Sequence, residues 1–147
     1  MITIEPATME HARTIRLRDG DAMEIAALGV TKEAGLGFSL ARSIWANAYL
    51  ADGEVAAISG LALTSMIGGD ATLWLITGEP VNRYKKEFLR LTRQRLAEVR
   101  REWPVLIDYV HAPYTEALRW LGFAIEPPRP FGPLGAPFCR AVIGEQA

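Results

Sequence analysis

The sequence has little of what several common classes of protein depend on. Its one cysteine, Cys139, excludes an internal disulfide and a zinc site built from several cysteines. Its two histidines, His11 and His111, lie too far apart in the chain to show a metal-binding spacing. The net charge of −1 provides no general attraction to nucleic acid or to a membrane surface. These scarcities exclude a disulfide-stabilised scaffold and give no sign of a metalloprotein.

Long apolar runs are also missing. The longest runs are too short to cross a bilayer, so we expect no membrane association. The first thirteen residues, MITIEPATMEHAR, contain acids and a proline where a secretory signal would need a continuous apolar segment. We therefore expect a cytoplasmic protein in a reducing environment.

What the chain does contain fits one globular domain. Half of its 147 residues are hydrophobic and 22% are charged, which is typical of a folded protein with a core of its own. No repeat, low-complexity segment or linker divides it. We interpret residues 1–147 as a single domain.

The first 50 residues predict a short strand and then helices. Thr8 is placed to cap a helix. Asp21 and Glu24 have the spacing of a capping box, in which the two side chains bind the first free N–H groups of a helix. Leu40, Ile44 and Trp45 suggest a helical stripe. The expected elements are a strand at 2–5 and helices at 9–18, 22–28 and 39–46.

The pattern then changes to strands. Asp52-Gly53 between two apolar runs predicts a hairpin of strands 48–51 and 54–66. Gly60 inside the second run suggests a bulge or a close approach of another segment of main chain. A turn at 67–70 leads to a strand at 71–77. The weak polar alternation of these strands predicts cover by helices on both faces.

A long amphipathic helix is predicted over 81–103, where Pro104 ends it. It lies between the strands 71–77 and 105–111, so these two strands should be parallel. A helix at 115–121, a strand at 123–126, a Pro/Gly-rich loop at 127–137 and a strand at 138–143 complete the chain. The fold class is therefore α/β (α+β), with a mixed, mostly antiparallel sheet and helices on both faces.

This order of elements resembles the GNAT (GCN-related N-acetyltransferase) superfamily over nearly the whole chain, and a parallel pair that splays apart, 71–77 with 105–111, is part of that resemblance. It is most similar to the small GNAT-like proteins of tailed podophages and prophages that are related to internal virion proteins. The segments that carry the resemblance are RDGDAMEI at 18–25, LWLIT at 73–77, FLRLTR at 88–93 and ALRWLGF at 117–123. The last is the most specific, because a short helix ending in Gly-Phe after a parallel strand is the usual GNAT ending.

The resemblance implies acetyl-CoA as the cofactor, bound at the turn after strand 71–77. Pro80 and Arg83 match the Pro-x-x-Arg entry of the superfamily's binding loop, but Lys86 and Phe88 stand where glycines would let a phosphate approach the main chain. Basic side chains beside a helix N-terminus could bind pyrophosphate instead. The opposite interpretation is that the loop has lost CoA. The expected cofactor-binding residues are Leu75, Thr77, Arg83, Tyr84, Lys85 and Lys86.

The resemblance also points to catalytic positions. The superfamily often has a tyrosine as general acid four residues before the late Gly-Phe, and Leu118 occupies that position here. Tyr114 is the nearest substitute, although it is out of register. Candidates for a general base by location are Glu79, Asp108 and His111. Each has an ordinary alternative, since His111 fits a hydrogen-bonding loop residue and Asp108 a buried carboxylate with a partner.

Three functions remain open. The first is a phage- or prophage-encoded, acyl-CoA-dependent N-acyltransferase acting on an amine. The second is a non-catalytic GNAT-fold protein that acts in phage particle assembly or binding, with phage structural proteins as partners. The third, least favoured, is nucleic-acid binding through the basic helix 81–103. A phage protein would work in the host cytoplasm or in the virion, and a homodimer is a further hypothesis.

Overall fold

The computed structural model describes residues 1–63 and 71–144. The elements in chain order are β1 (Ile2–Pro6), α1 (Met9–Thr14), α2 (Asp19–Ala27), α3 (Lys32–Arg42), β2 (Ser43–Ala51), β3 (Glu54–Leu63), β4 (Ala71–Thr77), the 3₁₀ turn η1 (Glu79–Arg83), α4 (Lys85–Glu102), β5 (Leu106–His111), the 3₁₀ turn η2 (Ala112–Tyr114), α5 (Glu116–Trp120), β6 (Ala124–Ile125), β7 (Arg129–Phe131) and β8 (Ala136–Ile143). The end of the predicted strand 54–66 and the turn at 67–70 lie outside the described residues.

The strands form one mixed sheet. Its order is β1-β2-β3-β4-β5-β8-β6, and β7 pairs with β8. Neighbouring strands are antiparallel except β4 and β5, which form the parallel pair that the crossover helix predicts. The predicted fold class is therefore confirmed.

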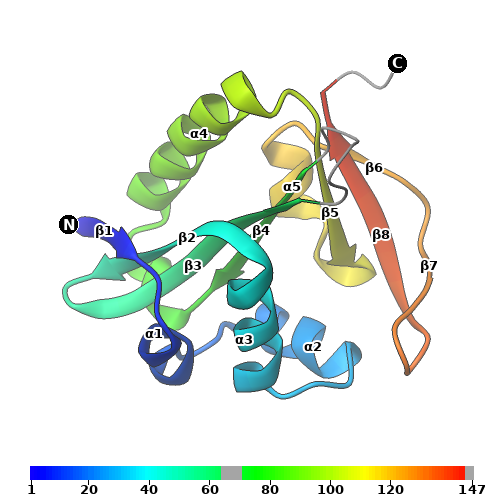
Figure 1. The fold of residues 1–147 in the computed structure, drawn as a ribbon, viewed down its shortest axis with the longest axis horizontal. Coiled ribbons are helices and arrows are strands. Elements are labelled where there is room, and N and C mark those ends of the chain that lie inside the picture. The colour runs from blue at the N-terminus through cyan, green and yellow to red at the C-terminus, as the bar shows by residue number, and fades with distance from the viewer. Residues whose placement is uncertain (64–70, 145–147) are drawn as a thin grey trace.

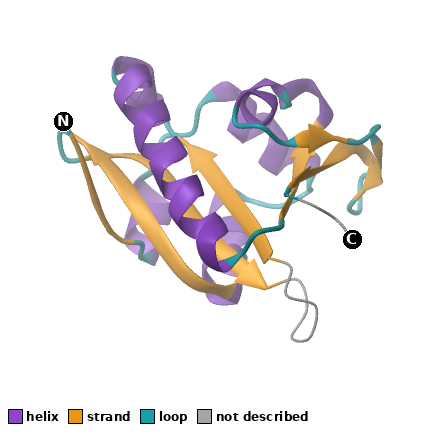
Figure 2. Cartoon of the chain, turned by 90° about the horizontal axis from the view of Figure 1, so that it is seen from above, coloured by secondary structure: helices purple, strands orange, loops and turns teal. Residues whose placement is uncertain are grey.

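Helices cover both faces of the sheet. α1, α2 and α3 gather on one side, and α4 and α5 lie on the other (Figure 1). α4 connects two regions of the core. Phe88 packs against Tyr49 and Ala57 of the N-terminal strands, whereas Leu96 and Val99 pack in a cluster that includes Leu61 of β3 and Leu106 of β5. Seen from above, α4 crosses the strands that lie behind it (Figure 2). Among the described residues, no helix is both long and apolar enough to span a membrane.

Local signals predicted several details correctly. Thr8 caps α1, and the His11 ring nitrogen Nδ1 completes the box by accepting a hydrogen bond from the Thr8 main-chain N–H at 3.0 Å. The hairpin of β2 and β3 turns at Asp52-Gly53, both with positive φ, as a two-residue turn requires. Gly60 makes room for the Trp74 indole on the neighbouring strand, since a Cβ at Gly60 would lie 2.6 Å from it. Gly60 therefore accommodates a side chain, and not the bulge or the close approach of main chain that the sequence suggested.

The predicted helix at 39–46 is wrong. α3 covers Lys32–Arg42, and β2 begins at Ser43. Trp45 pairs with Leu61 of β3, so tertiary pairing overrides the local helical stripe. The Ser43 hydroxyl donates to the Ser39 carbonyl oxygen at 2.7 Å and accepts from the Trp74 indole nitrogen at 2.7 Å, which fixes the point where helix becomes strand.

Other predicted boundaries also need correction. α1 ends at Thr14, four residues early, because the chain from Ile15 to Arg18 is extended and pairs with the end of β4. The long helix predicted from Val81 begins as a 3₁₀ turn, and the α-helix starts at Lys85. The segment 127–137 is not only a loop, because β7 lies within it and pairs with β8, which begins at Ala136.

Candidate functional site

β4 and β5 separate after a short pairing. Their register contains two residue pairs, Ala71 with Leu106 and Thr72 with Ile107. Beyond these pairs the strands continue to Thr77 and His111 without pairing to each other. Figure 2 shows the strands of the C-terminal part turned away from those of the N-terminal part. The candidate site lies where this separation leaves two strand edges facing each other.

The chain before α2 fills the outer end of the gap. The Arg18 N–H donates to the Thr77 carbonyl oxygen at 3.1 Å, and the Glu79 N–H donates to the Arg16 carbonyl oxygen at 2.8 Å. The Gly78 N–H donates to the Ala56 carbonyl oxygen of β3. Along a strand the main-chain groups of successive residues point alternately to the two sides, so those of Leu75, three residues earlier, point away from β3 and toward the gap. Leu75 lies past the last β4–β5 pair, which leaves its main chain placed to bind an extended ligand.

Two carboxylates of α2 bridge the separated strands. Asp21 accepts a hydrogen bond from the Thr77 hydroxyl at the end of β4, and Glu24 accepts one from the His111 main-chain N–H at 2.8 Å at the end of β5. The capping box predicted for these residues is therefore wrong, because α2 starts earlier, after Arg18, without a side-chain cap. A spacing of three residues also places two side chains on the same face of a helix. This spacing was the sequence signal that could have identified Asp21 and Glu24 as a pair of site residues.

The carboxylates around the gap hold their protons more tightly than usual. Burial raises the pKa of Glu24 from 4.5 to about 7, with a smaller contribution from the negative charge of Asp21. Burial also raises the pKa of Asp21, and burial together with the Glu24 charge raises the pKa of Asp108 well above its ordinary value. Glu24 is therefore available both as a carboxylate and as a carboxylic acid near neutral pH.

The structure brings two of the predicted catalytic residues into this group. Asp108 accepts a hydrogen bond from the Tyr109 N–H at 2.8 Å, on the edge of β5 where Glu24 binds. His111 is 8% exposed, and its Nδ1 atom is buried without a hydrogen-bond partner among the described residues. The roles assigned to Asp108 and His111 remain predictions.

The other two predicted catalytic residues lie differently. Glu79 is exposed in η1 and accepts a hydrogen bond from the Asn82 amide at 3.2 Å. The Tyr114 hydroxyl lies 2.8 Å from the Met23 sulfur, and the Tyr114 ring packs on Gly20 at the start of α2. Tyr114 thus borders the group of carboxylates, whereas no contact joins Glu79 to them in the described part of the chain.

The predicted cofactor-binding residues surround the N-terminus of α4. Arg83 forms an ion pair with Glu54 at 3.5 Å, and the Tyr84 hydroxyl donates to Asp52, so both side chains are turned toward the β2–β3 hairpin. Lys85 and Lys86 are exposed in the first turn of α4. Phe88 is 5% exposed and packs in the core, so its ring does not obstruct the helix N-terminus.

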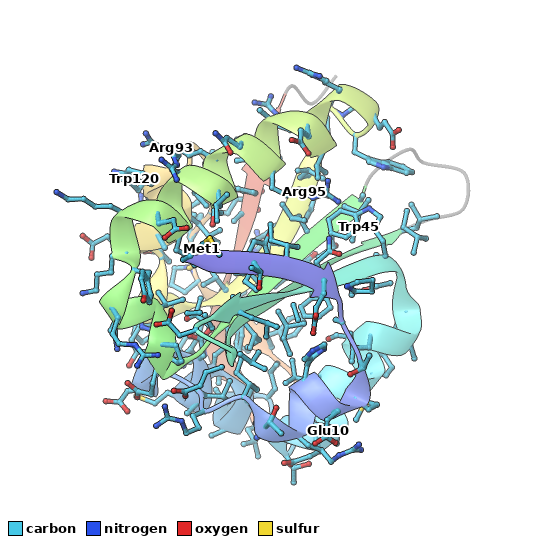
Figure 3. The ribbon with its side chains drawn as sticks, turned by 90° about the vertical axis from the view of Figure 1, so that its left-hand side faces the viewer. Met1, Glu10, Trp45, Arg93, Arg95 and Trp120 are labelled. Atoms are coloured by element: carbon cyan, nitrogen blue, oxygen red, sulfur yellow. The ribbon has the colours of Figure 1, made fainter. Side chains whose placement is uncertain are left out.

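A hollow of about 340 Å³ lies beside this turn, between α4 and α5. Three cations and an indole line it: Lys86, Arg90, Arg93 and Trp120. The Arg93 guanidinium lies 3.4 Å from the centre of the Trp120 ring, and the two side chains meet at one side of α4 (Figure 3). Positive charge and an aromatic surface are the features that bind a nucleotide.

Basic side chains and acidic side chains therefore flank the gap on opposite sides. Basic residues gather at the start of α4, while Asp21, Glu24 and Asp108 line the side toward α2 and β5. No group of three or more His, Cys, Asp or Glu side chains in residues 1–63 and 71–144 is arranged to hold a metal ion. This geometry suits an anionic molecule on one side and a cationic one on the other.

Comparison with known proteins identifies the fold. No family model matches the sequence, and no curated protein matches it either. Solved structures do match over nearly their whole length. The ribosomal-protein-S18-alanine N-acetyltransferase of Escherichia coli has a TM-score of 0.64 and 16% identity, with 100% of this chain and 97% of that one covered.

Two further structures agree. A Bacillus subtilis acetyltransferase in complex with CoA has a TM-score of 0.66 and 10% identity, with coverage of 99% and 98%. A Desulfovibrio desulfuricans protein assigned to the acetyltransferases of the GNAT family has a TM-score of 0.64 and 14% identity, with coverage of 98% and 99%. The chain therefore has the fold of the GNAT acetyltransferases.

Proposed function

We propose that the protein is an acetyl-CoA-dependent N-acetyltransferase that acts on an amine. The observation that carries this proposal is the separation of β4 and β5, with basic residues on one side of the gap and three carboxylates on the other. An anionic acyl donor and a cationic acceptor could approach each other there from opposite sides. The fold shared with acetyltransferases supports the same conclusion.

The cofactor side offers three kinds of contact. The main chain of Leu75 at the open edge of β4 fits an extended amide-containing arm, and the first N–H groups of α4 with Lys85 and Lys86 fit a pyrophosphate. The hollow beside Trp120 fits the nucleotide end. When bound, acetyl-CoA would supply the activated acetyl group.

The acceptor side offers a base. A protonated amine must lose a proton before its nitrogen can attack, and Glu24, with a pKa of about 7, can accept that proton near neutral pH. Asp21 adds negative charge that attracts the ammonium group, whereas the raised pKa of Asp108 favours its neutral, protonated form. Thr77 and the His111 N–H hold the α2 carboxylates in place.

Titration calorimetry with acetyl-CoA and with free CoA tests the proposal. We expect saturable micromolar binding, weakened about tenfold by Lys86→Ala, equivalent to about 1.4 kcal/mol. Arg101→Ala removes an exposed cation from the other end of α4 and should leave the affinity unchanged. If millimolar CoA produces no binding heat, the proposal is wrong.

One observation favours a second function. Phe88, at a glycine position of the GNAT motif, is part of the core, and Leu118, at the tyrosine position, packs against the core around β5 and β8. Neither residue can take the part that the motif assigns to its position. A non-catalytic role in phage particle assembly, based on the sequence resemblance, is therefore the alternative, and failure of CoA binding would favour it.

A further inference from the structure

A continuous chain of aromatic rings lies beside the carboxylates. Neighbouring ring centres are 5.2 to 5.9 Å apart, within the range of favourable aromatic contacts. The rings, in order, are Tyr109, Phe131, Phe138, His111 and Tyr114. They come from β5, β7, β8 and η2, so the chain reverses several times to assemble them.

Strand pairing sets these rings on one face. His111 is opposite Phe138 in the β5–β8 ladder, and alternation places Tyr109 on the same face as His111. Phe131 pairs with Ala136, two residues from Phe138, which brings its ring to that face as well. The turn between β7 and β8 lies against the end of α2, where Pro133 and Leu134 meet Gly29. The ring face is thus fixed by the sheet and by α2.

Part of this surface remains open to solvent. Tyr109, Tyr114 and Phe131 are 38 to 44% exposed, whereas Phe138 and His111 are buried beneath them. Exposed aromatic rings in one continuous patch commonly mark a binding surface. Two basic residues share this face: Arg140, opposite Tyr109, is paired with Glu126, whereas Arg129, opposite Phe138, is exposed at the rim.

The ring chain leads to negative charge. The His111 main chain binds Glu24, whose charge also acts on Asp108. The His111 ring adds a buried Nδ1 atom that has no hydrogen-bond partner among the described residues, although buried polar atoms are normally paired. An apolar aromatic surface that ends at carboxylates and an unused polar atom is complementary to an aromatic molecule with an ammonium end.

We propose, on the basis of the acetyltransferase function proposed above, that the acceptor is a primary amine carried on a short alkyl arm by an aromatic ring. Its ring lies on Tyr109 and Phe131, and its ammonium group faces Glu24. Glu24 takes one proton from the ammonium. The amine nitrogen then bonds to the acetyl carbon as the carbon–sulfur bond of acetyl-CoA breaks, the second proton goes to the CoA thiolate, and Glu24 releases its proton to water.

Phenethylamine, butylamine and spermidine are the probes that test this acceptor class. Binding is measured by calorimetry in the presence of free CoA, and turnover by release of CoA thiol from acetyl-CoA. We expect phenethylamine to bind at least tenfold more tightly than butylamine and to react with at least tenfold higher kcat/KM. Phe131→Ala should reduce the affinity and kcat/KM for phenethylamine about tenfold each. It should leave the affinity and kcat/KM for butylamine unchanged.

Two further variants keep the test specific. Phe131→Leu retains apolar bulk but removes the ring, so it should show the same selective loss even if the alanine variant folds poorly. Phe38→Ala removes an exposed phenyl ring from α3, outside the ring chain, and should change neither amine's values.

The outcomes separate this inference from the proposed function. If spermidine or butylamine matches phenethylamine while acetyl-CoA still binds, the aromatic acceptor is wrong and the acetyltransferase stands. If phenethylamine binds in a manner that depends on Phe131 but CoA does not bind, the amine site stands and acetyl transfer fails. If phenethylamine does not bind at all, the inference is overturned.

Discussion

At the scale of single residues, the ionisation of Glu24 makes stability depend on pH and, in the proposed function, controls activity as well. Its pKa rises from 4.5 to about 7 on folding, chiefly through burial. Between these values the folded protein binds more protons than the unfolded chain, so the free energy of unfolding falls as pH rises from about 4.5 to 7. We predict that Glu24→Gln, which can still accept the His111 hydrogen bond, removes this loss and becomes more stable than the wild type by about 3 kcal/mol above pH 7.

Urea denaturation across pH 4.5 to 8.5 measures the difference, with Glu102→Gln on the exposed part of α4 as the control. Glu24→Gln should also lower kcat/KM by at least about a hundredfold, because the proposed base is lost. In the wild type, kcat/KM should rise with pH and level off above about 7. A stability difference that is constant across this pH range would contradict the assignment.

The sequence predicted only part of this residue-scale picture. Asp108 and His111 were candidates because of their location near the two separated strands, and the structure brings them near Glu24. Asp21 and Glu24 were misassigned, because a carboxylate three residues from another fits both a helix cap and a shared helix face. Which of these two roles the carboxylates take depends on where β4 and β5 separate, and this separation depends on contacts between residues far apart in the sequence.

At the scale of elements, the junction of α3 and β2 shows where local signals fail. The sequence predicted the hairpin, the crossover and the late helix, because turn residues and helix ends carry local chemistry. It missed the start of β2, because Trp45 gains more from pairing with Leu61 than from continuing a helix. β7 was missed for a similar reason, since its Pro-rich sequence becomes a strand only by pairing with β8.

Ser43 is the residue on which this junction depends. Its hydroxyl links the Ser39 carbonyl, in the last turn of α3, to the Trp74 indole on β4. We predict that Ser43→Ala destabilises the fold by about 1 to 3 kcal/mol, because the partly buried indole N–H loses its partner. Ser39→Ala, which leaves the Ser39 carbonyl in place, should have little effect. Equal stability of the Ser43 variant and the wild type in urea denaturation would show that the link contributes nothing.

At the scale of the whole molecule, the sheet consists of two parts joined by a short parallel pairing. Two residue pairs connect β4 to β5, whereas seven connect β3 to β4 and six connect β5 to β8. α4 contributes Phe88 to one core cluster and Leu96 to a second, which contains Leu61 of β3 as well as Leu106 of β5. Because the main-chain pairing between the two parts is so short, the two parts should nevertheless open separately.

Hydrogen exchange checks this expectation. We predict that the amides of β5 and β8 exchange as one unit, with an opening free energy different from that of β2 and β3. Exchange measured over a range of subdenaturing urea should show two separate isotherms. A single isotherm shared by all four strands would contradict the prediction.

The segment from Arg16 to Arg18 has a consequence beyond the site. Unpaired strand edges are templates for pairing with other chains, and a sheet that opens in its middle creates two of them. Here the Arg18 and Glu79 main-chain bonds occupy the end of β4, and the Glu24 carboxylate occupies the His111 N–H of β5. The ends of both edges are therefore occupied, so in the described part of the chain only the short stretch of β4 around Leu75 stays open, and this limits pairing with a strand of another molecule.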